Sequence, residues 1–247
     1  MPAITGYDIR TLEEVKAPLR TASNINGFGG TFVPQKSDDY REVPFLLAPR
    51  GQYYPNNATN YLYGRTHLQT DSVLVFSFKP VTIPQRVEDY RNANARYWSI
   101  CLGAASNTRS YYSLCDVNAL SAPDKKSTFI VCQKQNPRLA EIEERVAEMN
   151  RAGALCNLFV WDKEKLDVDG NTIGDIIVIM YRNILPNEAW EYSISRMTPT
   201  NYADEEGEPL EKITDPEKQI AHIALGDYGP LGMKYSTKEI LEKDDIV

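Results

Sequence analysis

Three polar residues of this chain could carry chemistry: His67, Arg96 and Asp116. His67 lies four positions before Asp71, and a nearby carboxylate could make its imidazole a general base. Arg96 and Asp116 are expected near each other across a hairpin, where they would form a structural salt bridge. Alternatively, Arg96 could hold the carboxylate of a ligand. The other histidine, His222, stands between isoleucines on a predicted helix, and we expect no catalytic role for it.

The four cysteines form a second group of reactive side chains. Cys101 and Cys115 flank a predicted turn at 106–109. A hairpin centred near Thr108 would place them opposite each other and permit a disulfide. Cys132 and Cys156 could form another bridge, and the alternative is four buried free thiols. There is no C-x-x-C pair, and the two histidines are far apart in sequence, so we expect neither a metal site nor a cofactor.

Aromatic side chains are concentrated in the strand-rich part of the chain. On an open sheet face they could stack on sugar rings or line an apolar pocket, whereas the alternative is packing in the core. The residues we predict to bind a ligand are Tyr61, Tyr63, Arg96, Trp98 and Tyr112.

The elements that would position these side chains are mostly strands. Alternating or continuous apolar runs predict them at 61–64, 73–78, 97–102, 111–117, 128–133, 155–161 and 173–181. In the fourth run, Tyr111 is expected to share a face with Ser113 and Cys115. An apolar stripe behind the cap Asn136 predicts an inserted helix at about 137–152.

The remaining segments are predicted to be loop or helix. Helices are expected at 188–196, at 214–225 and after the capping box that begins at Ser236. The first fifty residues read as loop with one short helix. We therefore divide the chain into an N-terminal extension, 1–59, and a β-sandwich domain, 60–247.

Composition excludes several classes of partner. The net charge is −7 and no basic stripe is present, so nucleic acid is not an expected partner. No apolar run is long enough to span a membrane. The N-terminal sequence lacks the features of a signal peptide, although a leader could have been removed from it.

Several short motifs, in order, resemble a family of uncharacterised bacterial proteins, many of which are exported. The main ones are Arg96-Tyr-Trp-Ser-Ile-Cys101, Cys115-Asp-Val-Asn118 and Phe129-Ile-Val-Cys132. Two departures are Ser236, where the family has cysteine, and the helix that replaces a Pro-Ala-Asn segment. The resemblance implies an extracellular or periplasmic protein and, more distantly, a jelly-roll half of larger bacterial proteins. It supplies no established activity.

These observations predict an α+β protein that is mainly antiparallel β, a jelly-roll-like β-sandwich with inserted and C-terminal helices. The predicted function is a non-catalytic, exported protein that binds a small molecule or glycan, or assembles with copies of itself. The alternative is an enzyme with a pocket around Arg96, His67 and Asp116. If these three side chains lie together in the structure, the enzyme hypothesis is favoured. If they lie apart, that hypothesis has no candidate catalytic residues.

Overall fold

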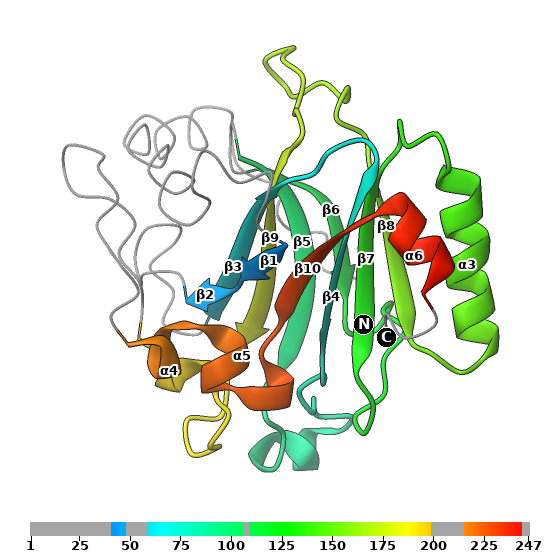
Figure 1. The fold of residues 1–247 in the computed structure, drawn as a ribbon. Coiled ribbons are helices and arrows are strands. Elements are labelled where there is room, and N and C mark those ends of the chain that lie inside the picture. The colour runs from blue at the N-terminus through cyan, green and yellow to red at the C-terminus, as the bar shows by residue number, and fades with distance from the viewer. Residues whose placement is uncertain (1–40, 48–58, 106–108, 199–214, 244–247) are drawn as a thin grey trace.

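A computed structural model describes residues 41–47, 59–105, 109–198 and 215–243 (Figure 1). Two five-stranded sheets pack face to face, and almost all neighbouring strands are antiparallel. The predicted α+β class, with mainly antiparallel strands in a β-sandwich, is therefore confirmed. The finer expectation of a jelly roll stays a prediction at this point.

Each sheet combines strands that are distant in sequence. In spatial order, the first sheet contains β1 (Glu42–Pro44), β10 (Leu231–Ser236), β4 (Ser72–Phe78), β7 (Ser127–Gln133) and β8 (Cys156–Trp161). The second contains β2 (Leu46–Leu47), β3 (Thr59–His67), β9 (Ile176–Ile184), β5 (Tyr97–Ala104) and β6 (Ser110–Cys115). The segment predicted as an N-terminal extension thus contributes an edge strand to each sheet.

The main core lies between the two sheets. Trp98, on the apolar face predicted for its strand, is 1% exposed. Its ring meets the edge of Phe78 at 5.8 Å between centroids, and Phe78 lies 4.5 Å from Tyr181. Burial of such large rings removes much apolar area from water and is the main force that holds the sheets together.

A helix covers the outer face of the first sheet. α3 (Leu139–Arg151) joins β7 to β8, which pair in parallel, and it buries Ile142 and Val146 against that face. Parallel neighbours require such a crossover. The predicted inserted helix is confirmed, but its N-cap is Arg138 and the predicted cap Asn136 was wrong. The Asn136 side chain accepts a hydrogen bond from the Arg138 amide at 2.9 Å, just before the helix. The C-terminal helix α6 (Thr237–Glu242) lies beside α3 and begins with the predicted capping box (Figure 1).

Two other helix predictions were wrong in extent. In place of 188–196 the chain makes turns and one short 3-10 helix, η4 (Ile194–Arg196). The described part of 214–225 forms two short helices, α4 (Pro216–Gln219) and α5 (Ala221–Ala224), and η5 (Gly226–Tyr228) follows. The break falls at Ile220, which is extended because it bridges to Leu46 at the sheet edge.

The predicted Cys101–Cys115 disulfide is absent: all four cysteines lie in the described ranges and all are free thiols. Cys101 stands opposite Ser113, and Cys115 stands opposite Ser99. The hairpin is centred one residue earlier than expected, so the two thiols are diagonal neighbours. Diagonal Cβ atoms are about 7–8 Å apart or somewhat less, which is too far for a disulfide.

A β-bulge changes the face of one predicted side chain. Leu102 pairs with Tyr112 but Gly103 pairs with Ser110, so Tyr111 is an extra residue in β6. Its ring therefore lies 6.1 Å from that of Trp161, beside Tyr112, and its predicted place on the face of Ser113 was wrong.

Candidate functional site

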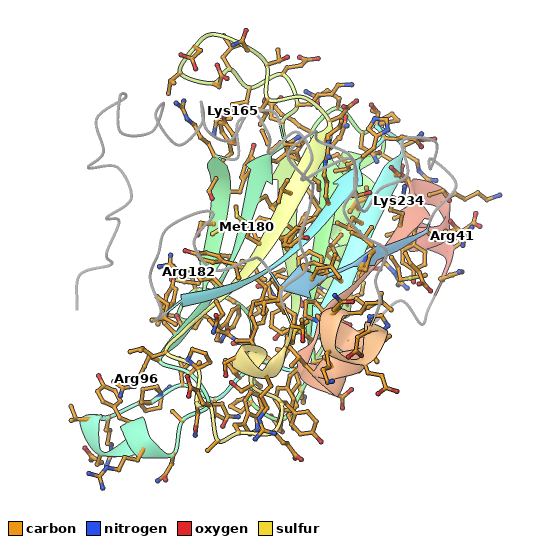
Figure 2. The ribbon with its side chains drawn as sticks, turned by 90° about the vertical axis from the view of Figure 1, so that its left-hand side faces the viewer. Arg41, Arg96, Lys165, Met180, Arg182 and Lys234 are labelled. Carbon is orange, nitrogen blue, oxygen red and sulfur yellow. The ribbon has the colours of Figure 1, made fainter. Side chains whose placement is uncertain are left out.

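The predicted catalytic trio does not converge. His67 pairs with Ile176 at one end of β9, whereas the Arg96 amide donates to the Ile184 carbonyl at the other end. Eight residue steps of strand separate these ends, about 27 Å at the usual rise. Figure 2 shows Arg96 at one extremity of the second sheet. An active site that contains both His67 and Arg96 is therefore excluded.

Arg96 and Asp116 lie at the same end of the hairpin, but no ion pair joins them within the described ranges. The Arg96 guanidinium lies over the ring of Tyr90, 3.9 Å from its centroid. The Asp116 carboxylate accepts from the Val117 amide at 3.0 Å, and burial raises its pKa. The expected salt bridge between them was wrong.

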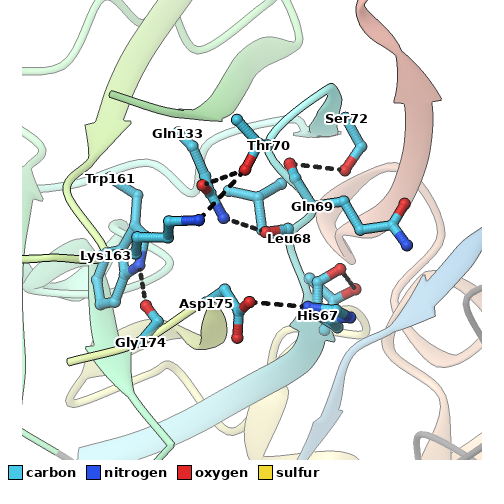
Figure 3. A network of polar contacts seen from close by, with 11 residues as sticks. His67, Leu68, Gln69, Thr70, Ser72, Gln133, Trp161, Lys163, Gly174 and Asp175 are labelled. Carbon is cyan, nitrogen blue, oxygen red and sulfur yellow. Dashed lines mark hydrogen bonds and ion pairs between the residues drawn. The ribbon is translucent and has the colours of Figure 1, made fainter. Parts of the chain in front are cut away.

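His67 contacts a carboxylate other than the expected one. Its Nε2 lies 3.0 Å from Oδ2 of Asp175, and both side chains are well exposed (Figure 3). The next residue, Leu68, donates its amide to the Asp175 carbonyl at 2.9 Å. The carbonyl of Asp71 instead accepts two hydrogen bonds from Thr237. His67 thus fastens the end of β3 to the start of β9.

A buried glutamine extends this polar network (Figure 3). Gln133 is 1% exposed; its Nε2 donates to the Leu68 carbonyl and its Oε1 accepts from Thr70 Oγ1 at 3.1 Å. Lys163 Nζ donates to the same Thr70 oxygen at 3.3 Å. These bonds join the β3–β4 turn, the end of β7 and the β8–β9 loop, which is a structural role.

The predicted ligand-binding aromatics are distributed over different surfaces. Trp98 belongs to the core, and Tyr63 is only 2% exposed on the outer face of the second sheet. Tyr61 lies on that outer face too, with the Arg182 guanidinium 5.6 Å from its ring centre (Figure 2 labels Arg182). Tyr112 packs inward, and its hydroxyl accepts from the Asp162 amide at 3.2 Å. With Arg96 at the strand end, these residues do not form one site.

A groove of about 450 Å³ lies on the outer face of the first sheet, beside α5 and η5. Its floor comes from alternate positions of the paired strands β4 and β10, since Met233 is opposite Val75. The floor side chains are mainly apolar: Val75, Ser77, Leu231, Met233 and Tyr235. The groove surface is about equally polar and apolar, and its volume lies in the range of small-molecule sites.

Polar groups form the rim of the groove. Lys126 Nζ and Asp227 Oδ1 form an ion pair of 2.8 Å, and the hydrogen bond from Lys126 lowers the pKa of Asp227. Burial lowers the pKa of His222, which favours its neutral imidazole. The Nδ1 atom of His222 is buried and has no hydrogen-bond partner in the described structure. The rim therefore offers a cation, an anion and an imidazole ring whose Nδ1 atom is buried.

A glycine allows α5 to approach the loop that follows η5. A Cβ atom on Gly229 would lie 2.0 Å from the Ala221 carbonyl oxygen, so no other residue fits without a backbone shift. His222 follows Ala221 directly, and this close approach places its ring at the rim.

Sequence reasoning missed this groove. His222 was discounted because of its apolar neighbours, on the assumption of one continuous helix. Three of the five floor residues belong to β10, which was not predicted as a strand. Its run, Leu231-Gly-Met-Lys-Tyr-Ser236, does alternate in polarity and was the available signal.

Across 41–47, 59–105, 109–198 and 215–243, no group of three or more His, Cys, Asp or Glu side chains is placed to hold a metal ion. In the same ranges no helix has the length and apolar character needed to cross a membrane.

Comparisons with known proteins add little. No family model matches the chain, and no curated protein matches it. A solved structure of an uncharacterized protein from Burkholderia cenocepacia is similar at a TM-score of 0.34 and 13% identity. The match covers 78% of this chain and 35% of the other, so this chain spans about a third of that protein's length. A likeness of this degree carries no argument, and the resemblance drawn from the motifs stays a prediction.

Proposed function

We propose that this protein is a non-catalytic β-sandwich that binds a small molecule, with a sugar as the first class to test, in the groove between β4, β10 and α5. The observation that carries the proposal is the convergence of an apolar floor with the Lys126–Asp227 pair and His222.

The chemistry of the groove suits a molecule with one apolar face and several hydroxyls. The ring of Tyr235 and the side chains of Val75 and Met233 can pack on C–H groups. Asp227 can accept from a hydroxyl, and Lys126 can donate to one. The imidazole of His222 also lines the groove, and its Nδ1 atom is buried.

Calorimetric titration with a panel of methyl glycosides tests the proposal. We expect at least one glycoside to bind the wild-type protein. Asp227→Asn should weaken its binding about tenfold or more, because a hydrogen bond to a charged group contributes about 1.5–3 kcal/mol. His222→Gln should also weaken it.

The matched control is His67→Gln, the same substitution in the other histidine. His67 lies near the Ser72 end of β4, whereas the rim of the groove lies near the Ser77 end. This control should bind as the wild type does. Absence of binding across the panel, or equal binding by all variants, would refute the proposal.

The alternative function, an enzyme, required His67, Arg96 and Asp116 to lie in one pocket. Its three candidates occupy both ends of the second sheet, and each has a structural partner. The contacts of His67 and its neighbour Leu68 with Asp175 join the end of β3 to the start of β9 (Figure 3).

We also propose that the sandwich is a jelly roll with two added strands. Without β2 and β8, the sheets read β1-β10-β4-β7 and β3-β9-β5-β6. The chain then passes to the other sheet at each step except β5–β6, as expected for eight strands folded as two Greek keys. An extracellular or periplasmic location remains a proposal that rests on the motif resemblance alone.

A further inference from the structure

The second sheet has an open edge, which is separate from the groove. β6 is the last strand of that sheet, and its sequence, Ser110-Tyr-Tyr-Ser-Leu-Cys115, contains no charge and no proline. Proteins usually protect long edge strands with charged residues or proline, because unpaired backbone groups recruit other strands. β6 has only the bulge at Tyr111.

The backbone N–H and C=O groups of Ser113 point away from the neighbouring strand β5. Asp116 donates its amide to the Trp98 carbonyl at 3.1 Å, so Trp98/Asp116 is a hydrogen-bonded pair. Such pairs alternate with non-bonded ones, which makes Cys101/Ser113 a non-bonded pair. The N–H and C=O of Ser113 therefore face the open edge, and the side chain of this residue is exposed.

The other described edges are shorter or partly capped. β1 has three residues and β2 has two. At the first residue of β8, the Asn150 side chain accepts from the Cys156 amide at 2.8 Å and donates to the Cys156 carbonyl at 3.0 Å, as a neighbouring strand would. β6 is thus the long edge that has no such cap in the described structure.

We propose that β6 pairs with β6 of a second copy of this chain, antiparallel about a two-fold axis at Ser113. This register would place Ser110 opposite Asp116 of the second copy, and Arg109 one position from that Asp116. Opposite charges would then meet at both ends of the interface. Val117 and Leu120, which are 78% and 47% exposed, follow β6 directly and extend the surface. A two-fold contact uses the same patch twice, as these features allow.

Sedimentation at several protein concentrations tests the interface. We expect the wild type to reach twice the 28.0 kDa of one chain. Ser113→Pro removes one edge N–H from each copy and should raise the dissociation constant roughly 30-fold or more, because two backbone hydrogen bonds are lost. Ser113→Ala keeps the N–H and should remain a dimer.

Two outcomes of sedimentation overturn the proposal. One is a monomeric wild type, and the other is a dimer that persists in Ser113→Pro. Loss of the dimer in Ser113→Ala as well would assign the contact to the side chain and would also overturn backbone pairing. Circular dichroism checks that Ser113→Pro folds, as expected for proline with its ring at a free edge.

A cross-linking variant keeps the test valid if Ser113→Pro does not fold. Cα atoms of a hydrogen-bonded antiparallel pair are about 5.5 Å apart, within disulfide range. Cys101→Ser and Cys115→Ser are combined with this variant, because Cys101 Sγ lies 3.4 Å from Ser113 Oγ and would form a disulfide within the chain with a new thiol there. In that background, mild oxidation of Ser113→Cys should give a covalent dimer linked 113 to 113, identified by mass spectrometry. Lys238→Cys in the same background, exposed on α6, should form no covalent dimer under the same oxidation. Equal cross-linking of both variants, or of neither, contradicts the proposal.

Discussion

The four thiols of this chain have two kinds of surroundings. Cys132 and Cys156 are buried under α3, where burial raises the pKa of Cys132 to about 12 and that of Cys156 to about 11. Cys101 and Cys115 lie on the outer face of the hairpin and are partly exposed. Because the thiolate is the reactive form, the first pair should be inert in the folded protein.

Thiol titration should therefore give two steps. In the native protein, Ellman's reagent should react with Cys101 and Cys115, and with all four cysteines only after unfolding. Cys101→Ser should remove one equivalent from the native count, whereas Cys132→Ser should leave it unchanged. Fewer than four reactive thiols after unfolding without reductant would show that the protein contains a disulfide, contrary to the structure.

His222 should make stability depend on pH. Burial holds its pKa below the ordinary value of 6.5, so the unfolded chain takes up this proton first as the pH falls. The free energy of unfolding should therefore decrease as the pH falls through 6.5 and down to the folded pKa. Urea unfolding at pH 7.5 and 5.5 should show a smaller decrease for His222→Gln. An equal decrease in both proteins would contradict this.

At the scale of elements, one side chain links two helices that are a hundred residues apart in sequence. The Asn136 side chain accepts from the Arg138 amide in the turn before α3 and donates to Thr237 Oγ1 at 2.7 Å, at the start of α6. Asn136 is only 4% exposed, so water cannot replace these bonds. The sequence placed Asn136 near the start of the helix, whereas its bond to Thr237 depends on the tertiary structure.

Asn136→Ala should lower the free energy of unfolding by about 2 kcal/mol, since it leaves buried hydrogen-bonding groups without partners. Chemical denaturation measures the change. Asn118→Ala, on an exposed loop, should change it by less than about 0.5 kcal/mol. Equal effects of the two substitutions would show that the α3–α6 link contributes no stability.

At the scale of the whole molecule, the proposed binding groove and the proposed dimer edge belong to different sheets. The groove lies on the outer face of β4 and β10, and the edge is β6. Figure 1 shows where these strands lie in the two sheets. Dimerisation through β6 would therefore leave the groove open, so each proposal can fail without the other.

Local pattern was sufficient to predict most elements of this protein. Seven of the strands, the inserted helix and the last capping box follow from alternation, apolar stripes and capping residues, which act over a few neighbouring positions. The alternation also placed Trp98 on the buried face of β5. The α+β class follows from these elements alone.

Tertiary structure decided which side chains meet. The one-residue shift of the β5–β6 hairpin separates Cys101 from Cys115, and the bulge turns Tyr111 toward Trp161. Pairing across β9 holds His67 and Arg96 at opposite ends of the second sheet. Register and strand order depend on contacts between distant segments, and local sequence does not contain that information. The candidate residues grouped by their sequence spacing therefore lie apart in the structure. The groove is lined instead by residues whose spacing did not suggest a common site.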